Sequence, residues 1–130
     1  MLDDIRGLLE PEFDVVGAVG DGQALISAVD TFKPDVIVTD ISMPRLNGIE
    51  AARLIIQKNP ASRIVLLTVH NDSALLERGF SAGALGYVLK LTAEDELSQA
   101  IHSALEDKRF ISPQIAYSSL RSRNINRPNP

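Results

Sequence analysis

Short apolar runs alternate with segments of helical periodicity along this chain. The apolar runs predict four strands, at residues 13–19, 35–40, 63–69 and 87–90. Apolar positions spaced by three or four residues predict helices at 2–10, 22–32, 49–59, 73–82 and 93–107. This alternation is typical of the α/β class, in which helices flank a parallel sheet.

Several predicted helices carry recognisable end signals. Asn47 is a good N-cap for the third helix, and Ser73 is the candidate cap of the fourth. Thr92, followed by an acidic first turn, fits the start of the last helix. Pro34 ends the second helix and leads into the strand that follows.

Composition indicates one globular domain with an ordinary core. The chain has 130 residues, of which 45% are hydrophobic and 23% charged. Its net charge of −4 argues against a nucleic-acid-binding surface. Three arginines among the last ten residues are better explained as part of a solvated linker. The chain has no cysteine, which excludes disulfides and thiol chemistry, and its two histidines argue against a structural zinc site.

The sequence predicts neither a membrane span nor a secretory signal. No apolar stretch approaches the length of about 20 residues that a membrane span needs. The first residues, Met1-Leu2-Asp3-Asp4, are acidic and unlike a secretory signal. We therefore expect a cytoplasmic protein with no membrane partner.

Polar residues capable of chemistry lie at the ends of three predicted strands. These are Asp40, Thr68 and the pair Tyr87 and Lys90. Since the carboxyl ends of parallel strands meet at one edge of a sheet, we expect a site there for a small anion. Asp40 can be phosphorylated as a nucleophile. Lys90 can neutralise phosphoryl oxygens, and the Thr68 hydroxyl can donate a hydrogen bond to one of them.

Each of these residues also has an ordinary structural explanation. Asp40 alone could be a strand-end cap, and Lys90 a solvated surface lysine. Thr68 could be a β-former with a satisfied hydroxyl, and Tyr87 a half-buried aromatic. Their occurrence together on successive strands favours the functional interpretation.

Two groups of residues resemble the receiver domain of bacterial response regulators. One is the motif Asp40-x-x-Met43-Pro44-x-x-x-Gly48. The other is Thr68 after an apolar strand, with Tyr87 three residues before Lys90. The sequences GALGYVLK, ending at Lys90, and FISP, starting at Phe110, also resemble the branch that precedes a LuxR/FixJ-type DNA-binding domain. The resemblance covers residues 1–120.

This resemblance implies a flavodoxin-like receiver fold over residues 1–112, with 113–130 as a linker toward an output domain. It implies that Asp40 accepts a phosphoryl group from a sensor histidine kinase and that Lys90 is its charge partner. Thr68 and Tyr87 would then reposition the face formed by residues 73–107 and so control an output, transcription.

Magnesium is the cofactor that the resemblance implies. Mg²⁺ would be held by Asp40 and by the backbone carbonyl of Ser42. The chain would not be an enzyme beyond self-catalysed phosphoryl transfer. The Lys90-Leu91 bond departs from the Lys-Pro common in the wider family, and little follows from this.

The front of the chain departs from the family pattern. The family begins with an apolar strand that ends in two adjacent acidic residues, whereas here only Met1 and Leu2 precede Asp3 and Asp4. We interpret Asp3 and Asp4 as exposed residues of a first helical turn. The first, central strand and the usual acidic pair are therefore expected to be missing.

Two predictions follow from this departure. Because Mg²⁺ prefers octahedral oxygen ligation, we predict weak Mg²⁺ binding and poor phosphorylation. Without the central strand, two strand edges are left open, so strand 13–19 would pair with 35–40, detach, or swap between chains. A homodimer or a strand-swapped oligomer is expected.

Two other functions stay open. One is a receiver-like interaction module that works without phosphate through the face of residues 73–107. The other is a small α/β phosphohydrolase with Asp40 as nucleophile, although Ser42 stands where such enzymes commonly carry a second carboxylate. A further hypothesis is that His70 tunes loss of the phosphoryl group, its alternative being a plain exposed loop histidine.

Overall fold

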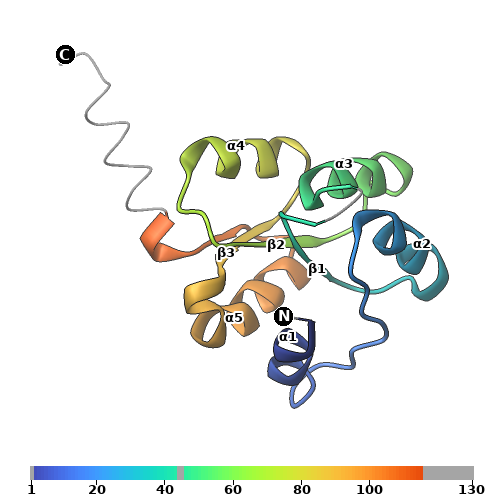
Figure 1. Cartoon of the computed structure of the whole chain (residues 1–130), viewed down its shortest axis with the longest axis horizontal. Coiled ribbons are helices and arrows are strands. Elements are labelled where there is room, and N and C mark those ends of the chain that lie inside the picture. Colours follow the sequence, from blue (N-terminus) through green and yellow to red (C-terminus); the bar gives the residue numbers. More distant parts are fainter. Residues whose placement is uncertain (1, 44–45, 116–130) are drawn as a thin grey trace.

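Four parallel strands form the sheet at the centre of the computed structural model (Figure 1). The structure describes residues 2–43 and 46–115, with side chains from Ile5 onward. The strands lie in the sheet in their order along the chain: β1 (Ile37–Asp40), β2 (Ile64–Thr68), β3 (Gly86–Leu89) and β4 (Phe110–Ile111). The α/β class and the parallel sheet predicted from the sequence are confirmed.

Helices cover both faces of this sheet. They are α1 (Leu2–Leu9), α2 (Gly22–Phe32), α3 (Gly48–Lys58), α4 (Ser73–Ser81) and α5 (Ala93–Leu105), with a 3₁₀ turn η1 (Lys90–Thr92) before α5. One hydrophobic core lies between the sheet and α2, α3 and α4, and the other between the sheet and α1 and α5. No helix in the described part of the chain is long and apolar enough to cross a bilayer.

Strand β2 shows how the apolar pattern builds these two cores. All five of its residues are buried. Ile64 and Leu66 point into the core under α3, whereas Val65 and Leu67 point into the core under α5. A strand covered on both faces needs an unbroken apolar run, which is why this segment is the most hydrophobic in the chain.

The predicted strand at residues 13–19 is wrong. Residues 14–19 have no regular secondary structure and belong to no strand of the described sheet. A sequence of strand propensity becomes a strand only where a hydrogen-bonded partner is present. The two-residue strand β4 was not predicted, and Lys90 begins η1 instead of ending β3.

The helix caps agree in part with the prediction. The Asn47 side chain accepts a hydrogen bond from the Glu50 N–H (2.9 Å), as expected of an N-cap. The fourth helix is capped by Asp72, whose carboxylate accepts from the Ala74 N–H (2.8 Å), so the assignment of Ser73 as its cap is wrong. Thr92 stands at the N-cap position of α5 but makes no side-chain capping bond.

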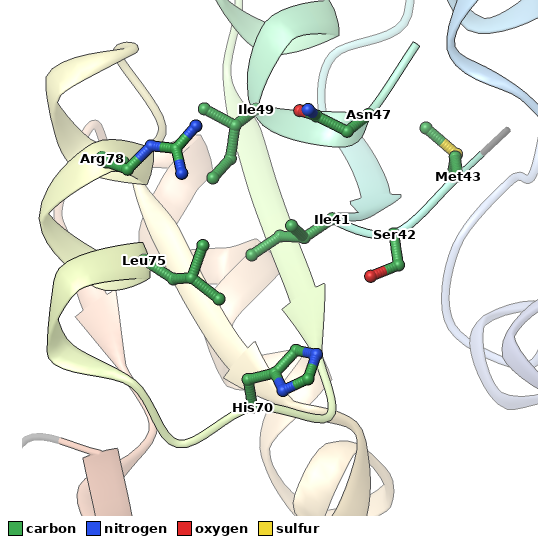
Figure 2. Close-up of a pocket in the computed structure, with 8 residues that line it drawn as sticks. All are labelled: Ile41, Ser42, Met43, Asn47, Ile49, His70, Leu75 and Arg78. Carbon is green, nitrogen blue, oxygen red and sulfur yellow. The ribbon is translucent and has the colours of Figure 1, made fainter. Parts of the chain in front are cut away.

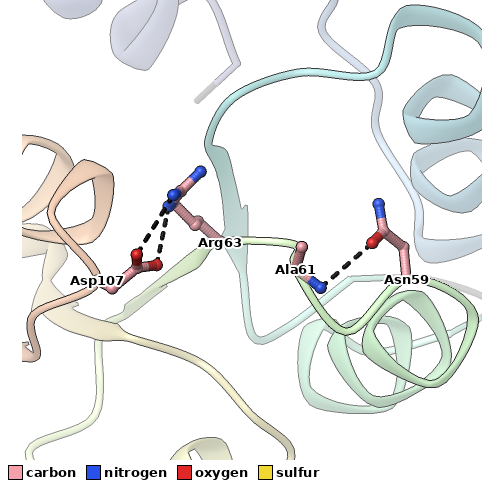
Figure 3. A network of polar contacts seen from close by, with 4 residues as sticks. All are labelled: Asn59, Ala61, Arg63 and Asp107. Atoms are coloured by element: carbon pink, nitrogen blue, oxygen red, sulfur yellow. Dashed lines mark hydrogen bonds and ion pairs between the residues drawn. The ribbon is translucent and has the colours of Figure 1, made fainter.

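An ion pair links the residue just before β2 to a residue just after α5 (Figure 3). The Arg63 guanidinium donates through Nε and Nη2 to the two Asp107 carboxylate oxygens, at 3.0 and 3.3 Å. Beside it, the Asn59 side chain accepts from the Ala61 N–H (3.2 Å) in the turn before β2. This network lies at the end of the sheet opposite Asp40. Pro44 and residues 116–130 of the predicted linker lie outside the described residues.

Candidate functional site

Three predicted site residues meet at the carboxyl edge of the sheet. The parallel register pairs Asp40 with Leu67 across β1 and β2, and Thr68 with Leu89 across β2 and β3. Lys90 follows Leu89 directly. Because β2 lies between the other two strands, Thr68 stands on the strand that separates the carboxylate from the ammonium.

Asp40 and Lys90 form an ion pair. The Lys90 Nζ lies 3.1 Å from the Asp40 Oδ2, and the two side chains are 19% and 22% exposed. Partial burial reduces screening by solvent, so the attraction exceeds that of a typical surface pair. The same partial exposure leaves Asp40 within reach of a small reagent from solution.

The loop after Asp40 is held closely against the strand. The Gly48 N–H donates to the Ile41 carbonyl (2.8 Å) at the start of α3. A Cβ at position 48 would lie 1.9 Å from the Asp40 carbonyl oxygen, far inside contact distance. The Thr39 hydroxyl donates to the same carbonyl (3.1 Å). Gly48 is therefore required by the close approach of two backbone segments.

Thr68 and Tyr87 are both buried beside this edge. The Thr68 hydroxyl accepts a hydrogen bond from the His70 N–H (3.0 Å), which fixes it within its own loop. Burial raises the pKa of Tyr87 to about 12. The Tyr87 hydroxyl itself has no hydrogen-bond partner among the described residues.

A pocket of about 570 Å³ opens next to the Asp40 loop (Figure 2). Its lining comes from the β1–α3 loop, the start of α3, the β2–α4 loop and α4: Ile41, Ser42, Met43, Asn47, Ile49, His70, Leu75 and Arg78. Figure 2 shows Leu75 and Arg78 of α4 across the pocket from Ile41 and Ile49. The predicted residues Ser42 and His70 thus line one pocket and are both exposed.

The described donor set does not fit a magnesium ion. Mg²⁺ prefers several oxygen ligands in octahedral geometry. Within the described residues, no three His, Cys, Asp or Glu side chains lie close enough together to hold a metal. Asp40 is instead paired with a cation, Lys90.

Ser112 is a residue of this region that the sequence did not point to. Its hydroxyl is fully buried, accepts from the Leu89 N–H (2.9 Å) and donates to the Glu96 carboxylate. Its backbone N–H donates to the Tyr87 carbonyl (2.9 Å). Ser112 thereby joins β4 and α5 to the residues just before Lys90. Its place in the FISP sequence was the only available signal.

Several known proteins are similar to this chain. The response regulator receiver domain family matches residues 1–102. The chain is 34% identical over 113 residues to the transcriptional regulatory protein DegU of Brevibacillus brevis, covering 87% of this chain and 48% of DegU. It is 37% identical over 116 residues to the response regulator GacA of Pseudomonas aeruginosa, covering 89% of this chain and 52% of GacA. The chain thus spans about half the length of these curated relatives.

A solved structure is similar over nearly the whole chain. It is a LuxR-family two-component response regulator from Aurantimonas sp. SI85-9A1, with a TM-score of 0.89 and 36% sequence identity. The match covers 94% of this chain and 89% of that one. The LuxR branch suggested by the sequence is therefore supported by fold and by identity.

Proposed function

The chain belongs to the family of response regulator receiver domains, homologous to two-component regulators that control transcription, and from this we propose that Asp40 is its phosphoacceptor. Receiver domains of this family interact with sensor kinases and are generally not enzymes in the ordinary sense. The observation that carries the proposal is the Asp40–Lys90 ion pair, 3.1 Å long, at the carboxyl edge of a parallel sheet.

The proposed reaction transfers a phosphoryl group from a histidine of a sensor kinase. An Asp40 carboxylate oxygen attacks phosphorus, so that an O–P bond forms as the N–P bond to the imidazole breaks. The leaving imidazole takes a proton from solvent. Lys90 lies where it can offset charge on the phosphoryl oxygens as they approach Asp40. No step is assigned to Mg²⁺; family members typically bind it, and we propose that this chain binds it weakly.

The proposed switch starts at Thr68. A phosphoryl group adds a charge of about −1.5 to −2 next to this hydroxyl. We expect the hydroxyl to leave the His70 N–H and donate to the phosphoryl group instead. The buried Tyr87 hydroxyl, which has no partner among the described residues, would respond to that movement. The response would spread to the face formed by residues 73–107.

Intact-mass spectrometry tests the proposal. The chain is incubated with Mg²⁺ and acetyl phosphate beside an Asp40→Asn variant. Asp35→Asn is the matched control, because Asp35 is an exposed acid just before the other end of β1. We expect one phosphoryl adduct on the parent and on Asp35→Asn, and none on Asp40→Asn. An adduct that persists in folded Asp40→Asn would refute the assignment.

A second candidate function is a receiver that works without phosphate through the same face. The lack of a cluster of three candidate metal ligands among the described residues favours it. In this case Asp40→Asn would leave partner binding unchanged, and the parent chain would gain no adduct.

The division of the chain into a receiver and a linker is also a proposal. We propose residues 1–112 as the receiver and 113–130 as its linker to a transcriptional output domain, acting in the cytoplasm. Relatives about twice as long support this division. Ile115 is fully buried in the core, so the first residues of this linker pack against the receiver.

A further inference from the structure

The pocket beside the Asp40 loop has apolar walls that the proposed phosphoryl transfer does not use. Leu75 of α4 stands across it from Ile41 and Ile49 (Figure 2). Ile41 and Ile49 are 6% and 1% exposed and belong to the core under α3, so their wall is rigid. The volume of about 570 Å³ falls within the usual range of small-molecule sites. These walls therefore suit the apolar body of a small molecule.

The polar groups of the same pocket favour a negative charge. They are the Arg78 guanidinium, the His70 imidazole, the Asn47 amide and the Ser42 hydroxyl. None of the described lining residues carries a carboxylate, although the whole chain has 17 acidic residues against 13 basic ones. An anion that enters the pocket thus meets a permanent positive charge on Arg78 and no acidic side chain of the lining.

Arg78 has no partner of its own. Its guanidinium forms no ion pair, hydrogen bond or ring contact with another described residue. The other described arginines all have one: Arg6, Arg53 and Arg63 face carboxylates, and Arg109 lies over the Phe80 ring. Figure 2 shows the Arg78 side chain extending from α4 toward Ile49. A planar guanidinium in this position can bind a carboxylate through two parallel hydrogen bonds.

The pocket also joins a fixed segment to one that the proposed switch would move. The fixed side is the Asp40 loop, where the Gly48 N–H donates to the Ile41 carbonyl (2.8 Å). The other side starts at His70, whose N–H donates to the Thr68 hydroxyl (3.0 Å). If that hydroxyl turns to a phosphoryl group, the bond that holds His70 is lost. A ligand that contacts both sides would therefore favour the arrangement without phosphate.

We propose that this pocket binds a small amphipathic carboxylate, which holds the β2–α4 loop in its unphosphorylated arrangement. The carboxylate pairs with Arg78, and the apolar body lies between Leu75 and Ile41. Binding itself does not depend on phosphorylation, whereas its effect on phosphorylation rests on the proposed role of Asp40. Because linkage is reciprocal, the phosphorylated chain should bind the ligand more weakly.

An NMR titration of the unphosphorylated chain tests binding. The probe is α-naphthylacetate, an apolar ring system with one carboxylate, and the control is its neutral amide, α-naphthylacetamide. We expect the acid to bind with a Kd of about 1 mM or less and to shift the backbone amides of Ile49 and Leu75. The amide should bind about tenfold more weakly, because it lacks the charge that pairs with Arg78.

Matched variants locate the bound carboxylate. Arg78→Met removes the charge but keeps an apolar side chain, and it should weaken binding of the acid about tenfold while leaving binding of the amide unchanged. Arg6→Met is the control, since Arg6 is also exposed but lies on α1, across the sheet from the pocket. It should bind the acid as the parent does. Both positions are exposed, where folding tolerates change.

Two further measurements test the effect of the ligand on the loop. Saturating ligand should slow hydrogen exchange at the His70 N–H about threefold or more, with no phosphate present. Ligand at about ten times its Kd should slow the acetyl phosphate reaction about fivefold or more in the parent, but not in Arg78→Met. A parent that gains no adduct even without ligand would contradict the role of Asp40, and binding and His70 exchange would still decide this proposal.

Several results would overturn the proposal. Equal binding of the acid and the amide, or unchanged binding of the acid to folded Arg78→Met, would remove the ion pair. Binding of inorganic phosphate as tight as that of the acid would show that the apolar walls contribute nothing. Saturation without any change in His70 exchange would show that the ligand does not hold the loop.

Discussion

Replacing Ser112 by alanine should destabilise the chain more than any other serine substitution among the described residues. Ser112 is fully buried, and its hydroxyl bonds both the Leu89 N–H and the Glu96 carboxylate. Ser112→Ala removes both bonds but retains the backbone bond to the Tyr87 carbonyl. The Leu89 N–H, also buried, would then be left without a partner.

The size of the effect follows from the two groups left behind. A buried donor without a partner costs about 1–3 kcal/mol. Glu96 is only partly buried, so water can replace the lost bond at a cost of about 1 kcal/mol or less. We therefore expect a loss of about 2–3 kcal/mol in the free energy of unfolding. At about 4 °C per kcal/mol, Tm would fall by roughly 8–12 °C.

Urea denaturation followed by circular dichroism measures this loss. Glu96→Gln keeps an acceptor for the Ser112 hydroxyl and should cost about 1 kcal/mol or less. Ser81→Ala, at an exposed position, should stay within about 0.5 kcal/mol of the parent. If Ser112→Ala also stays within that range, the hydroxyl does not hold β4 to the sheet as described.

Three further substitutions should have effects with separate physical causes. Gly48→Ala should lower the free energy of unfolding by about 3 kcal/mol in urea denaturation, because its Cβ would clash with the Asp40 carbonyl. Gly7→Ala, where a Cβ meets open space, should raise it by up to about 1 kcal/mol. Equal effects of the two substitutions would contradict the clash. In Tyr87→Phe the hydroxyl that has no partner is lost at little cost. The pKa of Tyr87 is about 12 in the folded parent against an ordinary value of 10.0, so the unfolded state loses the Tyr87 proton at lower pH. The stability of the parent should therefore fall between pH 10 and 12 more than that of Tyr87→Phe. Parallel curves of stability against pH would contradict this. Lys90→Met should change stability by about 1 kcal/mol or less but slow phosphorylation of Asp40 about tenfold or more, and an unchanged rate would remove Lys90 from the mechanism.

Much of the fold could be predicted because its causes are local. The apolar run of β2 is dictated by burial on both faces, and the Asn47 cap depends on a contact three residues away. Asp72 and Ser73 are both good caps, and sequence alone does not decide which of the two adopts the extended backbone that capping needs. The segment 13–19 has the composition of a strand but pairs with no strand of the described sheet, and pairing depends on other parts of the chain.

The candidate site could likewise be predicted only in part. The proximity of Asp40 and Lys90 could be predicted from the sequence, because parallel strands end at one edge of a sheet. Their 3.1 Å contact agrees with that prediction. The role of Ser112 could not be predicted, since its hydroxyl bonds Glu96 and Leu89, which are 16 and 23 residues away in the sequence. The strand that positions it, β4, has two residues, too few for a periodic signal.

The order of the strands has a consequence for synthesis on the ribosome. Each strand pairs with the one that directly precedes it in the chain, so the sheet can grow at one edge as successive segments emerge. Among the described strands β1 emerges first, and β2, β3 and β4 are then added one after another on the same side. An open edge is a template for pairing with other chains. Among the described strands, the growing edge of the sheet is therefore where the nascent chain is most vulnerable to misassembly, until Phe110–Ile111 has been added.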